Sequence, residues 1–311
     1  MRILITGGAG FIGSHLCKRL LDDGHSAVCF DNLSTSSKEN VDPFLSDSNF
    51  TFIEGDVKEG LPDVKCDVIY HLAARPSPID YMSQPVETLK TSLLGGLNVL
   101  EFAYERGCKV IFGSSSEVYG SPPDHAFPTP EGFWGMVNPI GVRSCYDEGK
   151  RSTEALCAAY NRKYGLKCVV VRIFNCFGPK MRRGDGRVIP TFISQALVGE
   201  PITVHGDGNQ TRSFCYVSDL ISGMVKLLNI DLNFLVLNLG NPEETRIIEI
   251  ARTIKRLTKS SSPIVFIPQR EDEPPRRLPD VSKAKRLLGW KPEVNLEEGL
   301  RKTIDWFKTA I

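Results

Sequence analysis

The chain has 311 residues and a formal net charge of +1, which allows a large core and two lobes and argues against nucleic acid or an anionic membrane surface as a partner. Apolar runs stay well short of the roughly 20 residues of a membrane span, and the first residues read as a strand rather than a secretory signal. The nine cysteines form no C-x-x-C pair, so we expect a cytoplasmic protein with reduced thiols and no metal site.

The first strand pattern, Ile3 to Ile5, ends in a glycine-rich turn that leads into a helical pattern. Strand, glycine turn and helix together are typical of a dinucleotide site, because glycines let the backbone approach a pyrophosphate and the helix N-terminus offers free N–H groups. A plain strand-to-helix connection is the alternative. The cofactor contacts predicted in this segment are Gly7, Gly10, Phe11, Ile12 and Gly13.

The next two strand patterns each end in an acidic residue. Asp31 follows the second strand pattern, where a carboxylate binds the adenosine ribose hydroxyls and repels a 2′-phosphate, so we predict NAD rather than NADP. Asp56 follows the third strand pattern and is a candidate contact of the adenine, although a plain turn residue is an equal alternative. Asn32 and Val57, which follow Asp31 and Asp56 in the chain, are predicted cofactor contacts as well.

The fourth and fifth strand patterns bring small and polar residues to the carboxyl edge of the predicted sheet, where open α/β sheets bind ligands. Leu72, Ala73 and Ala74 follow the fourth strand, and their small side chains would let the backbone lie against a cofactor. Ser115 and Glu117 follow the fifth strand, beyond a long helix expected over residues 85–106. A serine cluster with a glutamate is unusual for a simple turn.

Tyr146 and Lys150 lie four residues apart in a helical pattern and therefore share one helix face. A nearby ammonium group stabilises a phenolate and lowers the pKa of the phenol. The pair thus predicts Tyr146 as a general base. On spacing alone, an ordinary exposed tyrosine and lysine is the alternative.

We predict an α/β fold: a Rossmann-type doubly wound parallel sheet with a smaller C-terminal substrate-binding lobe. Strands and helices alternate regularly until about residue 173, and less regularly beyond. We therefore predict an NAD-binding domain over residues 1–173 and a mainly substrate-binding lobe over 174–311, with some of its segments returning to the first domain.

From Gly7 to about Trp306 the chain resembles the extended short-chain dehydrogenase/reductases that act on nucleotide sugars, and within them the UDP-glucuronate decarboxylases. The tyrosine–lysine pair marks the superfamily, and two runs are more specific: Asn138-Pro139-Ile140-Gly141 and Tyr146-Asp147-Glu148-Gly149-Lys150-Arg151. The other matching runs are Ser116-Glu117-Val118-Tyr119-Gly120, Arg172-Ile173-Phe174-Asn175-x-Phe177-Gly178-Pro179, Gly184-Asp185-Gly186-Arg187-Val188 and Gln210-Thr211-Arg212.

The resemblance implies that Ser115, Tyr146 and Lys150 form the catalytic group and that NAD is reduced and regenerated within one turnover. Oxidation at C4 of UDP-glucuronate makes a β-keto acid, which loses carbon dioxide before C4 is reduced again to yield UDP-xylose. Glu117 and Arg212 are implied in the decarboxylation, and Arg212 is equally a candidate diphosphate ligand. The implied substrate contacts are Ser116, Tyr81, Asn175, Arg187, Arg212 and Arg277. A homodimer through the helices near residues 85–106 and 145–164 is implied as well.

Three other functions are alternatives for a chain with these motifs. A nucleotide-sugar 4-epimerase shares the oxidation, and the run Asn32-Leu33-Ser34-Thr35 is closer to epimerases, but epimerases usually have a small or hydroxyl residue where Glu117 stands. A 4,6-dehydratase would carry an Asp-Glu pair, whereas this chain has Ser116-Glu117. A non-catalytic NAD-binding protein would typically have lost Tyr146 or Lys150.

Overall fold

A seven-stranded parallel sheet forms the larger part of the molecule, which the computed structural model describes over residues 1–309. Its strands occur in the order β11-β6-β5-β4-β1-β2-β3, the reversal after β1 being that of a doubly wound sheet. Their bounds are β1 Arg2–Thr6, β2 Ser26–Asp31, β3 Phe50–Glu54, β4 Val68–His71, β5 Lys109–Ser115, β6 Cys168–Ile173 and β11 Phe234–Leu239.

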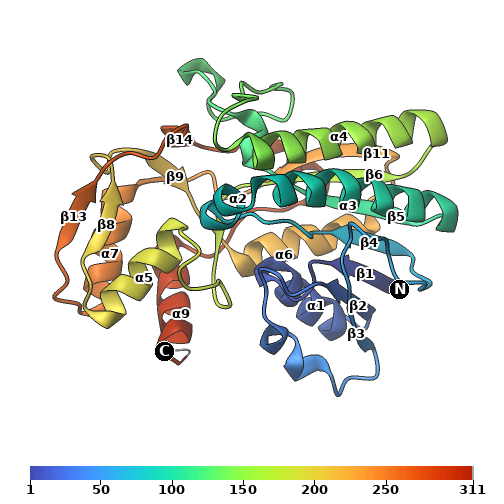
Figure 1. The fold of residues 1–311 in the computed structure, drawn as a ribbon, viewed down its shortest axis with the longest axis horizontal. Coiled ribbons are helices and arrows are strands. Elements are labelled where there is room, and N and C mark those ends of the chain that lie inside the picture. The colour runs from blue at the N-terminus through green and yellow to red at the C-terminus, as the bar shows by residue number, and fades with distance from the viewer. Residues whose placement is uncertain (310–311) are drawn as a thin grey trace.

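Helices cover both faces of this sheet and pack around three small sheets beside it (Figure 1). The α-helices are α1 Phe11–Asp22, α2 Pro78–Ser83, α3 Pro85–Arg106, α4 Ser144–Tyr164, α5 Val188–Val198, α6 Val217–Lys226, α7 Ile247–Thr258, α8 Ser282–Leu288 and α9 Leu296–Thr309. Short 3₁₀ turns are η1 Lys38–Asn40, η2 Asp42–Phe44, η3 Ser116–Tyr119, η4 Asp124–Ala126 and η5 Leu227–Asn229. None of the helices over residues 1–309 is long and apolar enough to cross a membrane.

The sheet is buried on both faces because its strands alternate between two cores. On β1, Ile3 and Ile5 pack into the core that includes α1 and α6, whereas Leu4 packs into the core that includes α3 and α4. Successive side chains of a strand point to opposite faces, and a doubly covered parallel sheet therefore needs an almost continuous apolar run. The predicted α/β doubly wound sheet is confirmed.

The small sheets lie beside the carboxyl edge of the large one. They pair β13 with β8, β10 with β7, and β9 with both β12 and β14. Their strands are β7 Cys176–Phe177, β8 Ile202–His205, β9 Thr211–Ser213, β10 Cys215–Tyr216, β12 Glu244–Arg246, β13 Ile264–Ile267 and β14 Arg276–Arg277. In Figure 1 the group formed by α5, α7, α9, β8 and β13 stands apart from the seven-stranded sheet. In contrast, β11 joins the large sheet next to β6.

Candidate active site

A cleft of about 560 Å³ runs from the carboxyl edge of the large sheet to the group of small sheets. Its walls include the residues that directly follow β1, β4 and β6 and the ends of β2 and β5. Ligands of doubly wound folds bind at this edge. Every site residue predicted from the sequence lines the cleft except Asp56.

The turn after β1 is closed so tightly that two of its glycines have no room for a side chain. Gly7 has φ +71°, and a Cβ there would lie 2.7 Å from the main-chain nitrogen of Ala73. A Cβ on Gly13 would lie 2.2 Å from the carbonyl oxygen of Gly7. Helix α1 begins immediately after Gly10 without a side-chain cap. Its first N–H groups therefore face the cleft as an anion site.

Asp31 is held rigidly at the end of β2. Its carboxylate accepts hydrogen bonds from the main-chain nitrogens of Ala9 and Leu33, at 3.0 and 2.9 Å, and from the Ser36 hydroxyl at 2.8 Å. These bonds keep an acidic group at the rim of the cleft, as a ribose site requires. Asp56 instead accepts a hydrogen bond from the Asn32 side chain at 2.9 Å and does not line the cleft.

Ser115, Tyr146 and Lys150 meet where α4 packs on the end of β5, and all three are buried. The Lys150 ammonium donates a hydrogen bond to the carbonyl oxygen of Gly113 at 2.7 Å, which fixes α4 to the strand. Tyr146 stacks on Tyr81 with ring centroids 5.5 Å apart. The structure thus brings together the predicted catalytic group from two segments.

The expected lowering of the pKa of Tyr146 by Lys150 is wrong for this arrangement. Burial is the largest influence and raises the pKa of Tyr146 to about 12, although the hydrogen bond with the Ser115 hydroxyl lowers it. Burial also lowers the pKa of Lys150 to about 8. The ammonium is directed at the Gly113 carbonyl, so desolvation of the phenol outweighs its influence.

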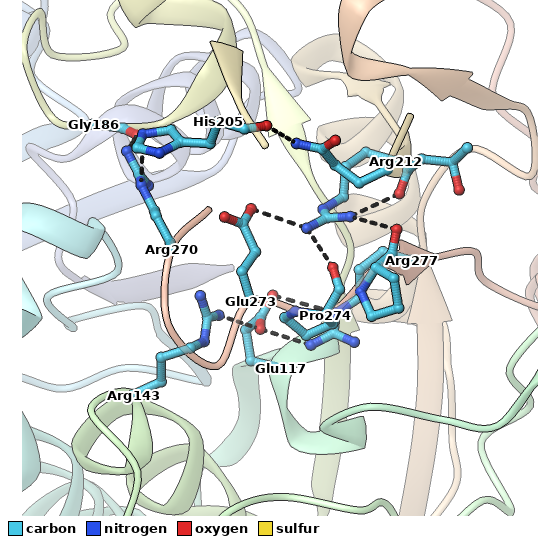
Figure 2. A network of polar contacts seen from close by, with 12 residues as sticks. Glu117, Arg143, Gly186, His205, Arg212, Arg270, Glu273, Pro274 and Arg277 are labelled. Carbon is cyan, nitrogen blue, oxygen red and sulfur yellow. Dashed lines mark hydrogen bonds and ion pairs between the residues drawn. The ribbon is translucent and has the colours of Figure 1, made fainter. Parts of the chain in front are cut away.

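Glu117 lies between two arginines from distant parts of the chain, as Figure 2 shows. Arg277 donates a hydrogen bond to the Glu117 carboxylate at 2.8 Å, and Arg143 donates to the same oxygen. Burial alone would raise the pKa of Glu117, but the two guanidinium groups hold it well below its ordinary value. Glu117 is therefore a carboxylate anion.

Arg212 lines the cleft but does not hydrogen-bond Glu117. Its guanidinium donates to the carbonyl oxygens of Thr211, Pro274 and Pro275 and to the Glu273 carboxylate, at 2.7 to 3.2 Å. The sequence paired Arg212 with Glu117 in the chemical step, whereas Arg277 and Arg143 hold that carboxylate in the structure. This arrangement fixes the Arg212 guanidinium to the segment 273–275, of which Glu273 and Pro274 line the cleft.

The predicted substrate contacts lie in the same cleft. Besides Arg212 and Arg277, these are Ser116, Tyr81, Asn175 and Arg187. Arg187 is paired with Asp185, whereas the amide nitrogen of Asn175 is buried without a hydrogen-bond partner among residues 1–309.

Sequence reasoning missed Arg143 and Glu273, which both line the cleft. Arg143 comes three residues before Tyr146 and directly precedes α4, and its closeness in the chain to the predicted base could have drawn attention to it. No comparable local signal points to Glu273, since its loop reaches the site only through the tertiary fold.

The doubly wound sheet, the glycine turn and the Ser115–Tyr146–Lys150 group together define a dinucleotide-dependent enzyme of the short-chain dehydrogenase/reductase class. The sequence model of the NAD dependent epimerase/dehydratase family matches residues 3–240. The chain belongs to this family.

Similar proteins include decarboxylases and an epimerase. UDP-glucuronic acid decarboxylase 1 of Danio rerio is 53% identical over 100% of this chain and 73% of its own length. UDP-glucuronic acid decarboxylase 3 of Arabidopsis thaliana is 49% identical over 96% of this chain and 87% of its own length. The solved structure of UDP-glucuronic acid 4-epimerase from Bacillus cereus, in complex with UDP-glucuronic acid and NAD, is 30% identical with a TM-score of 0.90, each chain being covered completely. The resemblance predicted from the motifs is thus confirmed.

Proposed function

We propose that this protein converts UDP-glucuronate to UDP-xylose and carbon dioxide with NAD as its cofactor. The observation that carries the proposal is identity of about half, along the whole chain, with proteins named UDP-glucuronic acid decarboxylase. The epimerase of the same fold is only 30% identical. Glu117, which stands where epimerases usually have a small or hydroxyl residue, is an anion inside the cleft.

The cofactor fits the first half of the cleft. The α1 N-terminus would bind its pyrophosphate, Asp31 its adenosine ribose, and Lys150 its second ribose. When bound, NAD supplies a hydride acceptor and a positive charge beside the phenol. This positive charge would favour the phenolate form of Tyr146 and so lower its pKa, against the effect of burial.

The buried hydroxyl groups suit proton transfer at C4 of the sugar. Tyr146 would accept the proton of the C4 hydroxyl, and Ser115 would hydrogen-bond the same oxygen. The β-keto acid loses carbon dioxide as its C5–C6 electron pair moves into the ketone to form an enolate. The protein needs only to hold the carboxylate and stabilise the enolate charge, after which C5 is protonated and C4 reduced.

A second hollow of about 230 Å³ adjoins the cleft and suits the nucleotide of the substrate. It shares Arg270 and Glu273 with the main cleft and adds the apolar side chains of Phe192 and Ile247. A flat base packs well on such side chains, while the arginine suits a diphosphate.

The homodimer implied by the resemblance is part of the proposal. Helices α3 and α4 lie side by side across one face of the sheet (Figure 1). The side chains of Val86 and Leu94 on α3 are exposed, so pairing of this face with a second copy would bury them. Light scattering of the purified protein tests this: twice the chain mass is expected, and one chain mass contradicts a dimer.

Product analysis by NMR after incubation with UDP-glucuronate and NAD tests the proposed function. UDP-xylose together with carbon dioxide is the expected result. UDP-galacturonate would identify a 4-epimerase, and an accumulating 4-keto pentose would show that the final reduction fails. Unchanged sugar would overturn the assignment.

A further inference from the structure

Among the cleft arginines, Arg143 differs from Arg212 and Arg277 in having a buried side-chain N–H donor that no group in the described part of the chain accepts from. A guanidinium group carries five N–H donors, and Arg143 makes one side-chain hydrogen bond, to Glu117. Its Nε is buried without a hydrogen-bond partner among residues 1–309 and lies 3.7 Å from the Asp147 carboxylate. Figure 2 shows its guanidinium beside Glu117, opposite Arg277, whereas Arg212 contacts Glu273 and Pro274 instead.

Arg277 and Arg212 have their donors largely satisfied by the protein. Arg277 donates to Glu117 through Nε and Nη2 and to the Gly120 carbonyl through Nη1. Arg212 donates through both terminal nitrogens, mostly to main-chain carbonyl oxygens. Leaving such buried carbonyl groups unpaired is costly, so neither guanidinium can readily turn to a ligand.

Arg143 is also close in the chain to Tyr146, the residue with which the proposed chemistry starts. Arg143 directly precedes α4, and its carbonyl oxygen accepts a hydrogen bond from the main-chain nitrogen of Tyr146 at 3.0 Å. The ring of Tyr81 connects them, since it stacks on Tyr146 and lies 5.8 Å from the Arg143 guanidinium carbon. In a glucuronate, the carboxylate is attached to C5, the neighbour of C4. A C4 hydroxyl on Tyr146 therefore brings that carboxylate to this part of the wall.

The charges around Arg143 leave room for one more anion. Arg143, Arg212 and Arg277 face the carboxylates of Glu117 and Glu273. The remaining acid, Asp147, is buried, and its Oδ1 has no hydrogen-bond partner among residues 1–309. Burial and the nearby Glu117 raise the pKa of Asp147 to about 7, so a further carboxylate would favour its neutral form.

We propose that Arg143 binds the carboxylate of the sugar and thereby selects an acidic sugar over a neutral one. This inference rests on the proposed function and assigns a substrate contact that the sequence motifs did not. Arg143 would use its spare donors for the substrate while it keeps the bond to Glu117. The hydrogen bonds from Arg277 would hold the Glu117 carboxylate in place when the sugar carboxylate binds.

The test compares binding of UDP-glucuronate and of UDP-xylose, which lacks the carboxylate, by titration calorimetry with saturating NAD. A Tyr146→Phe background prevents turnover. Arg143→Gln should weaken UDP-glucuronate about tenfold to a hundredfold, the range of a charge-assisted hydrogen bond, and leave UDP-xylose within about twofold. Arg143→Lys keeps the charge without the fork geometry and should give a smaller loss.

Arg276→Gln is the matched control, because Arg276 pairs with Glu244 and does not line the cleft; both ligands should bind as in the background protein. Equal weakening of both ligands by Arg143→Gln would show a structural role and overturn the inference, as would no weakening of either. Unchanged UDP-xylose binding also shows that the variant is folded. If the Tyr146→Phe protein itself binds neither ligand, the proposed function fails and the inference with it.

Discussion

Arg172 on β6 donates hydrogen bonds to both carboxylate oxygens of Glu154 on α4, at 3.0 and 2.7 Å. The same carboxylate accepts a hydrogen bond from the Ser114 hydroxyl at 2.6 Å. Ser114 precedes Ser115 on β5, and Glu154 follows Lys150 by one turn of α4. This ion pair therefore connects the two segments that carry the catalytic group.

Glu154→Gln should lower the free energy of unfolding by about 3 kcal/mol, because it leaves the Arg172 charge without its counterion in a mostly buried position. Urea denaturation measures the change. Glu297→Gln is the control, since Glu297 pairs with Arg256 and Arg301 at the exposed surface, where such pairs contribute little. Equal effects of the two variants would show that burial of the Glu154 pair is unimportant.

Tyr146→Phe should reduce the rate of UDP-xylose formation by at least about a hundredfold, since it removes the proposed base, while NAD still binds. The measurements are product formation by NMR and cofactor binding by fluorescence. Tyr160→Phe on the same helix serves as the control and should keep full activity, because Tyr160 does not line the cleft. Substantial turnover by the Tyr146 variant would exclude the phenol as the base.

Asp147→Asn should change how stability depends on pH. In the folded protein the pKa of Asp147 is raised to about 7, whereas an unfolded aspartate has a pKa of about 3.9. Between these values the folded state binds more protons, so the wild-type free energy of unfolding should fall relative to the variant as pH rises from about 4 to 7, and then level off.

Denaturant unfolding of both proteins at pH 5, 6, 7 and 8 measures this difference. Glu148→Gln changes a partly exposed acid at the neighbouring position and should show no comparable trend. If the free energies of unfolding of the Asp147 variant and the wild type differ by the same amount at all four pH values, the raised pKa of Asp147 is contradicted.

Asp31→Asn should weaken NAD binding about tenfold and narrow the preference for NAD over NADP, because it removes the charge that repels a 2′-phosphate. Fluorescence titration with both cofactors measures the two affinities. Asp56→Asn provides the comparison: Asp56 contacts Asn32 rather than the cleft, so its effect should be smaller. A larger loss of NAD affinity in the Asp56→Asn variant than in the Asp31→Asn variant would instead support the adenine contact that the sequence predicts for Asp56.

Local patterns in the sequence determined the fold class and most of the candidate site. The glycines before α1 follow from backbone crowding within one turn, and Tyr146 and Lys150 share a face because a helix has a fixed period. The residues at the ends of β2, β4 and β5 could be placed because the ends of parallel strands share one edge of the sheet. Each of these features depends on residues that are close in the chain.

Tertiary structure alone decided the charge arrangement inside the cleft. Glu117 meets Arg277 across 160 positions of sequence, and the choice of Arg277 and Arg143 over Arg212 as its partners depends on how the 273–277 segment packs. Spacing also suggested a lowered pKa for Tyr146, whereas burial raises it. The physical reason is that electrostatic interactions and desolvation depend on distance and burial in space, which a linear pattern does not encode.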